Sequence, residues 1–328
     1  MAEPLPSWLE PLWQSLVRRR QHAHAYLLQG VPGIGKRELA NRLGAWLLCS
    51  AAQPEGACGQ CKSCLLLQAG SHPDVFEVYP EEPDKPIRVD QVRELVDFIT
   101  RTAQLGGRKL VQLAPAEAMN LNAANALLKS LEEPSGDTVM LLVSHQPSRL
   151  LPTIRSRCQA LSCPPPSMAQ ALDWLQVHLP EADEAQRRQL LALAGGAPLR
   201  ALELQAAGVI EQRLQVEEDI KRLLKQQAAP SELAERWKAI PLTLLFEWFC
   251  QWSLQVLRVQ LAGSQAALED GMAKVIGYLA ERAALAELLA LQDWLLAERQ
   301  KLLGKANLNP TLLLEALLVR WASLLPPR

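Results

Sequence analysis

The chain has 328 residues, of which 49% are hydrophobic and 21% are charged, and its net charge is −1 at pH 7. This length predicts two or three domains with ordinary apolar cores. The near-neutral charge excludes a whole-protein field that would attract nucleic acid. We expect no secretory signal, because the first residues lack a positive region followed by an apolar core, and no membrane span, because no uncharged apolar run reaches about 18 residues.

The first predicted elements lead into a glycine-rich loop. Residues 9–20 have the apolar spacing of an amphipathic helix, 25–29 form a short apolar strand, and 37–49 again have helical spacing. A strand, a glycine-rich loop and a helix in this order are typical of a phosphate-binding loop, whose backbone N–H groups and lysine surround an anion. The residues that would hold the anion are Gly30, Gly33, Gly35 and Lys36.

Four of the seven cysteines follow the pattern C-x8-C-x2-C-x2-C, within residues 49–64. They are Cys49, Cys58, Cys61 and Cys64. This spacing lets four thiolates surround one ion, and a closed four-thiolate shell predicts a structural zinc, Zn²⁺, in a reducing compartment. The alternatives are an iron–sulfur cluster, although the chain shows no other redox machinery, or four unrelated thiols. The other three cysteines are predicted to be small core residues.

Strands and helices alternate over the next hundred residues. We predict strands at 74–79, 109–114, 138–143 and 159–162, and helices at 90–104, 121–133 and 151–157. Strands that are apolar throughout and separated by helices indicate a parallel sheet covered on both faces. The fold class predicted for residues 1–165 is therefore α/β, with a Rossmann-like sheet and the cysteine module as an insertion.

The rest of the chain is predicted to be helical. Pro164–Pro166 marks the first boundary, because three prolines are stiff and incompatible with a helix. Residues 166–208 then read as a small helical domain, and 209–328 as a larger one rich in Leu and Ala. The tryptophans of the larger domain lie on apolar helical stripes, which favours a core or subunit-interface position over base stacking.

Three motifs carry a resemblance to a known family. Asn125–Pro134 reads NALLKSLEEP, Leu151–Cys158 reads LPTIRSRC, and Asn307–Pro310 reads NLNP. Together with the glycine-rich loop and the cysteine module, they closely resemble bacterial clamp-loader subunits of the AAA+ class. The resemblance implies an AAA+ P-loop domain, a helical lid at 166–208 and a helical collar at 209–328 that oligomerises.

The groups that hydrolyse ATP in this family are missing. The residue after the loop lysine is Arg37, which cannot ligate Mg²⁺ as Ser or Thr would. Counting back from the NALLK motif, the acidic pair that serves Mg²⁺ and primes water is replaced by Ala114 and Pro115. Glu117 is near in the sequence, but it lies past the strand end, and we interpret it as a residue at a helix start. The three losses match the delta-prime class of this family, in which the ATP site is degenerate, although the intact loop leaves ATP or ADP binding without turnover open.

One catalytic motif is intact. In this family the arginine at the position of Arg157 reaches the ATP of a neighbouring subunit, so the resemblance implies an arginine finger that acts in trans. Arg200 resembles the lid arginine that senses nucleotide, and a packing or helix-start role is an equal alternative.

The resemblance also implies partners and a place in the cell. It predicts a non-hydrolysing stator subunit of the DNA polymerase III holoenzyme in the cytoplasm, within a hetero-pentamer of gamma/tau motor subunits and a delta subunit. The assembly would load the sliding clamp onto primer-template DNA. Two other functions stay open: an active ATPase with an unconventional site, and a stand-alone zinc-dependent nucleic-acid-binding protein.

Overall fold

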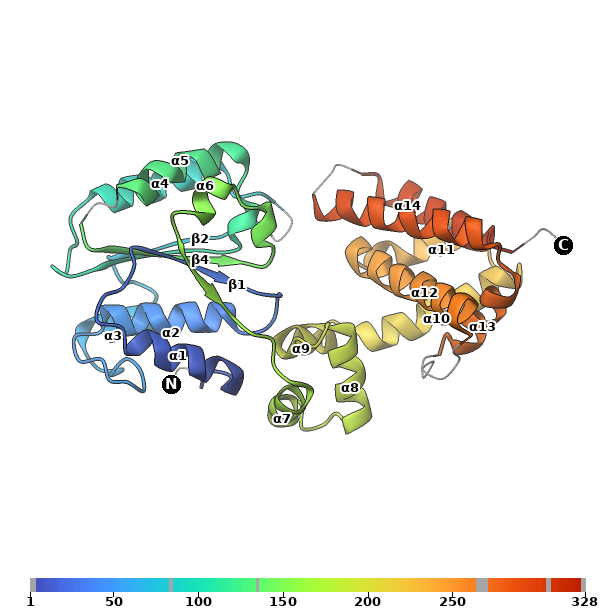
Figure 1. Ribbon diagram of the computed structural model, residues 1–328, viewed down its shortest axis with the longest axis horizontal. Coiled ribbons are helices and arrows are strands. Elements are labelled where there is room, and N and C mark those ends of the chain that lie inside the picture. The colour runs from blue at the N-terminus through green and yellow to red at the C-terminus, as the bar shows by residue number, and fades with distance from the viewer. Residues whose placement is uncertain (1–3, 83–84, 134–135, 264–270, 305–307, 326–328) are drawn as a thin grey trace. The chain divides into compact units, whose positions relative to one another are not determined.

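The computed structural model describes residues 4–82, 85–133, 136–263, 271–304 and 308–325. Pro134 and Asn307, which belong to two of the motifs above, lie outside the described residues. The chain divides into two compact units, Met1–Ala207 and Gly208–Arg328, each with its own core (Figure 1).

The first unit is built around one parallel sheet. Its strands are β1 (Ala25–Gln29), β2 (Val75–Val78), β3 (Lys109–Leu113), β4 (Thr138–Ser144) and β5 (Gln159–Ser162). They pair in the order β2-β3-β4-β1-β5, and every pair is parallel. The predicted α/β class with one parallel sheet is thereby confirmed. Because all strands point the same way, the segments that follow β1, β3 and β4 meet at one edge of the sheet.

Helices cover both faces of this sheet (Figure 1). One face carries α1 (Glu10–Val17), α2 (Lys36–Leu48) and α3 (Lys62–Gln68), and the other carries α4 (Val89–Thr100), α5 (Leu121–Glu132) and α6 (Pro152–Arg155). Successive strand residues point to opposite faces, so Leu27 and Val111 join the core under α4 and α5, whereas Tyr26, Leu28 and Leu110 join the core under α1 and α2.

Several of these helices differ from the sequence prediction. The helix expected over 9–20 covers only Glu10–Val17, and the helix expected over 90–104 already ends at Thr100. The helix expected over 151–157 ends at Arg155, and the backbone N–H of Arg157 instead closes a turn on the carbonyl of Ile154 at 3.1 Å. Helix α3 was not predicted, because glycines and cysteines precede it and it has only seven residues. It begins within the cysteine module and places Cys64 on its first turn.

Three short helices complete the first unit: α7 (Met168–His178), α8 (Glu184–Leu193) and α9 (Pro198–Ala206). Ser167 and Asp183 each start a helix with a reciprocal capping box, which satisfies backbone N–H groups that the first turn leaves unpaired. Trp174 of α7 packs edge-on against Trp8 with ring centroids 6.1 Å apart. The small helical segment predicted after the three prolines is therefore present, and it packs against the sheet layer that carries the glycine-rich loop.

The second unit is entirely helical in its described part, as predicted. Its helices are α10 (Val209–Leu224), α11 (Pro230–Arg236), α12 (Leu242–Ala262), α13 (Ala273–Arg282), α14 (Leu285–Leu303) and α15 (Pro310–Ala322). The domain 209–328 contains five tryptophans. Four of them are buried in its core, namely Trp237, Trp248, Trp252 and Trp321. Their core placement confirms the packing interpretation. Among the described residues, no helix combines the length and the apolarity that spanning a membrane requires.

Candidate functional site

The glycine-rich loop lies where the sequence placed it, between β1 and α2. Gly33 and Gly35 adopt φ angles of +74° and +91°, in the left-handed region that glycine enters without strain. Gly35 is the residue from which α2 starts, so the N-terminus of that helix faces the loop. The strand, loop and helix thus follow one another as predicted from the spacing, and phosphate binding by the loop stays a prediction.

The lysine of this loop is turned toward the loop itself. Lys36 is only 3% exposed, and its Nζ donates to the carbonyl oxygen of Gly30 at 2.7 Å and to that of Val31. Burial lowers the pKa of Lys36 to about 8, against the opposing attraction of Cys163 and Glu117. The ammonium group thus satisfies carbonyls of the protein, and nucleotide binding by the loop stays a prediction.

Helix α9 lies directly against the same loop. The backbone N–H of Leu199 donates to the carbonyl of Gly33 at 3.0 Å. A Cβ added to Gly33 would come within 2.6 Å of the Cβ of Arg200. On the other side, the indole N–H of Trp8 donates to the carbonyl of Ile34 at 2.9 Å. The backbone of Arg200 therefore lies against the loop. Whether its side chain senses nucleotide stays a prediction.

The positions of the missing catalytic groups converge at this edge of the sheet. Ala114 and Pro115 follow β3 directly, and the backbone N–H of Ala114 donates to the carbonyl of Val78 at 3.1 Å. Arg37 is exposed in the first turn of α2, and its guanidinium lies 4.4 Å from the centre of the Tyr79 ring. None of these three side chains supplies an oxygen for a metal or a base for water.

One carboxylate does point into this region. Glu117 Oε1 accepts the backbone N–H groups of His145 and Gln146, at 2.8 and 3.1 Å, immediately after β4. Within the described residues, Glu117 Oε2, Ser144 Oγ and His145 Nδ1 are buried without a hydrogen-bond partner. Glu117 lies in the short 3-10 helix Ala116–Ala118, which confirms its interpretation as a helix-start residue, and its side chain also ties the segment after β3 to the end of β4. The pKa of His145 is lowered, mainly by burial and in addition by repulsion from Lys36.

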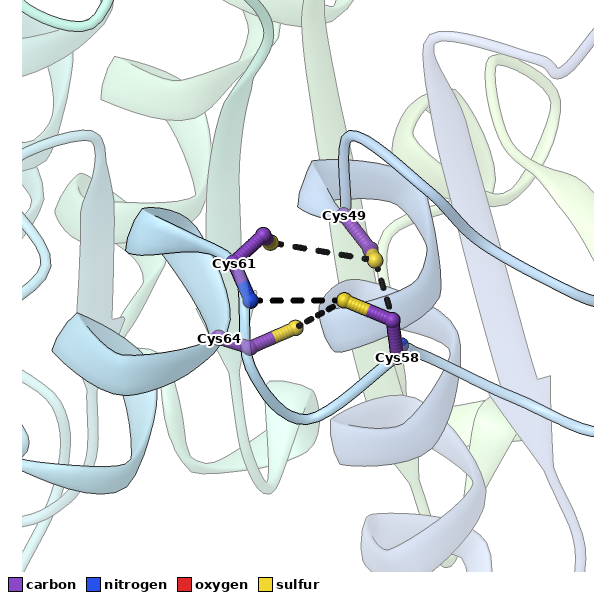
Figure 2. Close-up of side chains that lie close together, drawn as sticks. All are labelled: Cys49, Cys58, Cys61 and Cys64. Carbon is purple, nitrogen blue, oxygen red and sulfur yellow. Dashed lines mark hydrogen bonds between the residues drawn. The ribbon is translucent and has the colours of Figure 1, made fainter.

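The four cysteines of the module gather at one point (Figure 2). All four Sγ atoms lie within 4.8 Å of one another, with Cys58 and Cys64 4.0 Å apart and Cys61 and Cys49 3.9 Å apart. A tetrahedral site with Zn–S bonds of about 2.3 Å has S···S edges of about 3.8 Å. The donor set and its dimensions therefore fit a metal ion with four thiolate ligands.

Backbone groups prepare these thiols for a metal. The N–H of Cys58 donates to Cys49 Sγ at 3.2 Å, and the N–H of Cys61 donates to Cys58 Sγ at 3.4 Å (Figure 2). Hydrogen bonds from the backbone of Cys64 and Ser50 lower the pKa of Cys61 to about 5. Such donors stabilise the thiolate form, which is the form that ligates a metal.

The module is fastened to the helices beside it. Three carbonyl oxygens of the module each accept a hydrogen bond. Trp46 donates to residue 53 at 2.8 Å, Trp13 donates to residue 54 at 3.0 Å, and Arg42 donates to residue 55. Arg42 also lies over the Trp13 ring, 4.7 Å from its centre. These contacts fix the segment between the first and second cysteine. The sequence did not predict them, since the three donors lie on α1 and α2.

The side chain of Arg157 is held by three acceptors. Its backbone position is fixed because Ile154 and Cys158, on either side, are buried in the core beneath α5. Its side chain is 33% exposed. Nη1 donates to the carbonyl of Thr153 at 2.9 Å and to Ser156 Oγ at 3.4 Å, and Nη2 pairs with Glu132.

Comparison with known proteins covers both units. Residues 7–167 match the family model described as DNA polymerase III, delta subunit, and residues 207–323 match DNA polymerase III, delta subunit, C terminal. A DNA polymerase III subunit delta' of Pseudomonas aeruginosa is 60% identical over 328 residues, which is the full length of both chains.

Two further similarities are weaker. A DNA polymerase III subunit tau/gamma of Haemophilus influenzae is 31% identical over 169 residues, covering 52% of this chain and 22% of that protein. A solved gamma subunit-related protein of Thermotoga maritima covers 97% of this chain and 99% of its own at 21% identity, but its TM-score of 0.42 is too low to support an argument.

The full-length identity, the two family matches, the P-loop sheet and the four-cysteine module agree with one another. The chain therefore belongs to the family of DNA polymerase III delta-prime subunits, the clamp-loader subunits of bacterial DNA replication.

Proposed function

We propose that this chain is a non-hydrolysing stator of the clamp loader that presents Arg157 to the ATP of a neighbouring motor subunit. One observation carries the proposal. The backbone of this arginine is fixed by buried neighbours and its side chain is one-third exposed, whereas the chain's own site has Arg37, Ala114 and Pro115 in place of catalytic groups. An arginine with no substrate in its own subunit is useful only to another one.

The chemistry of such an arginine is electrostatic. As the γ-phosphoryl group moves from ATP to water, negative charge spreads over its oxygens. A guanidinium brought to that position stabilises the charge through planar, paired N–H donors, an effect of about 10³–10⁵ in kcat in related NTPases. Arg157 would supply this group without itself taking or giving a proton.

The degenerate loop contributes structure to this picture. Lys36 donates to carbonyls of the loop, and Leu199 of α9 donates to Gly33. These contacts support a stator whose lid at 166–208 stays closed on the sheet. ATP or ADP binding without hydrolysis at Gly30, Gly33, Gly35 and Lys36 is compatible with the loop geometry, and it forms a secondary part of the proposal.

The partners follow from the family. Similarity to a tau/gamma subunit supports assembly with motor subunits of that type, and we extend this to a delta subunit within a hetero-pentamer in the cytoplasm. The helical domain 209–328 would form the collar through which the subunits associate. Through the assembly, the chain would help load the sliding clamp onto primer-template DNA, with any direct DNA contact made to phosphates.

The four cysteines complete the proposal as a structural zinc site. Cys49, Cys58, Cys61 and Cys64 would hold the ion and leave no position for water, so zinc would fix the module and take no part in catalysis. The backbone contacts of residues 53–55 would then transmit this order to α1 and α2.

The test is the variant Arg157→Ala in a reconstituted clamp loader. We expect normal folding, metal content and assembly, because ion pairs as open to solvent as Arg157 with Glu132 contribute little to stability. Steady-state ATP hydrolysis stimulated by DNA and clamp should fall only in part, since one site of the ring loses its arginine. Arg157→Lys should not restore the rate, because an ammonium group lacks the planar fork. Equal rates for wild type and Arg157→Ala, with assembly confirmed by gel filtration, would show that the chain is a scaffold alone.

A further inference from the structure

The contacts of Arg157 single out a second residue of the same site. Glu132 is the last residue of α5, and its Oε1 pairs with Nη2 of Arg157. The two residues are 25 positions apart in the chain, so the pair exists only because α5 packs beside the turn after α6. Leu127 and Leu131 of α5 share a buried core with Ile154, which fixes the two backbones relative to each other.

The pair leaves part of the guanidinium available. Nη1 donates to Thr153 and Ser156, and Nη2 donates to Glu132. Arginine has five N–H groups, and among the residues that the structure describes these three contacts leave two of them for a further acceptor. A guanidinium whose orientation is already set by these contacts is suited to meet a phosphate without a search through its rotamers.

We propose that Glu132 is the positioning residue for Arg157, holding the guanidinium in the orientation that a neighbouring subunit's phosphate group meets. This inference rests on the proposed function, since positioning matters only if Arg157 acts in trans. Glu132 itself would touch neither ATP nor water. Its carboxylate would act through the arginine alone, by reducing the freedom of a long and flexible side chain before the phosphate arrives.

The size of the effect follows from the exposure of the pair. The side chains of Arg157 and Glu132 are 33% and 49% exposed, and solvent weakens ion pairs of this kind. The ordered orientation is therefore favoured by at most about fivefold over the released one. Loss of the pair should lower turnover at the affected site by up to about fivefold, and it should leave the stability of the chain nearly unchanged.

The experiment compares Glu132→Gln and Glu132→Ala with Glu133→Gln in reconstituted complexes. Glu133 is the adjacent exposed glutamate, and among the described residues no ion pair involves it, so it controls for charge. We expect both Glu132 variants to lower kcat for DNA- and clamp-stimulated ATP hydrolysis. The KM for ATP should be unchanged, because the finger acts on charge that develops in the transition state. Glu132→Ala should lose more than Glu132→Gln, which keeps an acceptor oxygen, and Glu133→Gln should behave as wild type.

A double-mutant cycle separates positioning from a structural role. If Glu132 acts through Arg157, then Glu132→Gln should have no further effect in an Arg157→Ala background. A full effect in that background would overturn the inference, and so would an unchanged or raised kcat for Glu132→Gln in the wild-type background. If Arg157→Ala alone leaves the rate unchanged, the proposed trans role fails first. If Arg157→Ala lowers the rate and Glu132→Gln does not, only the positioning inference fails.

Discussion

The four cysteines show how far single residues determine the properties of this chain. Their Sγ atoms lie at distances that suit one tetrahedral ion, and backbone N–H groups donate to the Sγ atoms of Cys49 and Cys58. Since the module lies outside the strands of the sheet, the ion should order the segment 49–64 without being needed for the sheet itself. Metal binding and folding are coupled in such a site, but the coupling should remain local.

We therefore expect purified, chelator-free protein to contain about one zinc per chain. Cys61→Ser should strongly reduce the zinc content while circular dichroism retains the signal of a folded α/β protein. Cys250→Ser is the matched control, because Cys250 belongs to α12 of the second unit and not to the cluster. Elemental analysis decides the result. Wild-type protein without zinc or iron would remove the metal site, and bound iron would indicate an iron–sulfur cluster instead.

The contact made by the Glu117 side chain could not be predicted from the sequence. Its carboxylate accepts two backbone N–H groups from residues 145 and 146, which lie 28 and 29 positions further along the chain. No local pattern encodes such a contact, because it depends on β3 and β4 being neighbours in the sheet. A sequence signal was nevertheless present, namely an acidic residue close behind a buried strand in a chain whose catalytic acids are missing.

At the scale of elements, the contact between the glycine-rich loop and α9 is the most specific one. Gly33 combines a positive φ angle with a close approach, since an added Cβ would lie 2.6 Å from Arg200 Cβ and 2.7 Å from its backbone N. Such distances force a shift of the backbone. The small helical segment and the loop are therefore fitted to each other at a position where only glycine is tolerated.

Gly33→Ala should lower the free energy of unfolding by more than the strain of the left-handed backbone, which is roughly 1–2 kcal/mol. Gly106→Ala isolates that strain, because Gly106 has nearly the same φ angle, +72°, and no atom within 4 Å of an added Cβ. Urea denaturation of the two variants measures the difference, and limited proteolysis should show earlier cleavage near Pro164–Pro166 in Gly33→Ala alone. Equal losses of stability would mean that the contact with α9 adds nothing.

The elements that sequence analysis predicted well are those with strong local signals. The buried strands and the helices between them follow from apolar periodicity, and the loop follows from its glycines. The end of α6 was misplaced by two residues, because the turn after Arg155 is set by packing of Ile154 and Cys158 in the core. Helix α3 was missed, because its seven residues are too few to show a periodic pattern.

At the scale of the whole molecule, the two units differ in what their sequences disclose. The first unit contains motifs whose residue spacing is typical of phosphate loops and metal sites. The sequence therefore predicted individual residues of the loop and of the cysteine cluster. The second is a set of helices around buried tryptophans, with Arg213 and Glu217 forming a buried ion pair at 3.1 Å. Helical periodicity predicts such a core but not its partners, so the collar function stays a proposal.

The whole chain should not turn over ATP on its own. The hydroxyl that holds Mg²⁺, the metal carboxylate and the base are replaced by Arg37, Ala114 and Pro115, and the loop lysine donates to carbonyls of the protein. Without these groups, neither the metal nor the attacking water can be positioned, and positioning provides most of the catalysis in phosphoryl transfer.

Phosphate release by the purified chain should therefore stay at background with ATP and Mg²⁺, whether or not primed DNA is added. Lys36→Ala is the control, because it removes the one intact catalytic residue of the loop and should leave this background unchanged. Calorimetric titration with ATP on the same samples separates binding from turnover, and weak binding without hydrolysis would be consistent with the loop geometry. Sustained hydrolysis that Lys36→Ala abolishes would contradict the stator proposal. It would direct attention to Glu117, whose carboxylate ties the end of β4 close to the loop, as the source of an unconventional base.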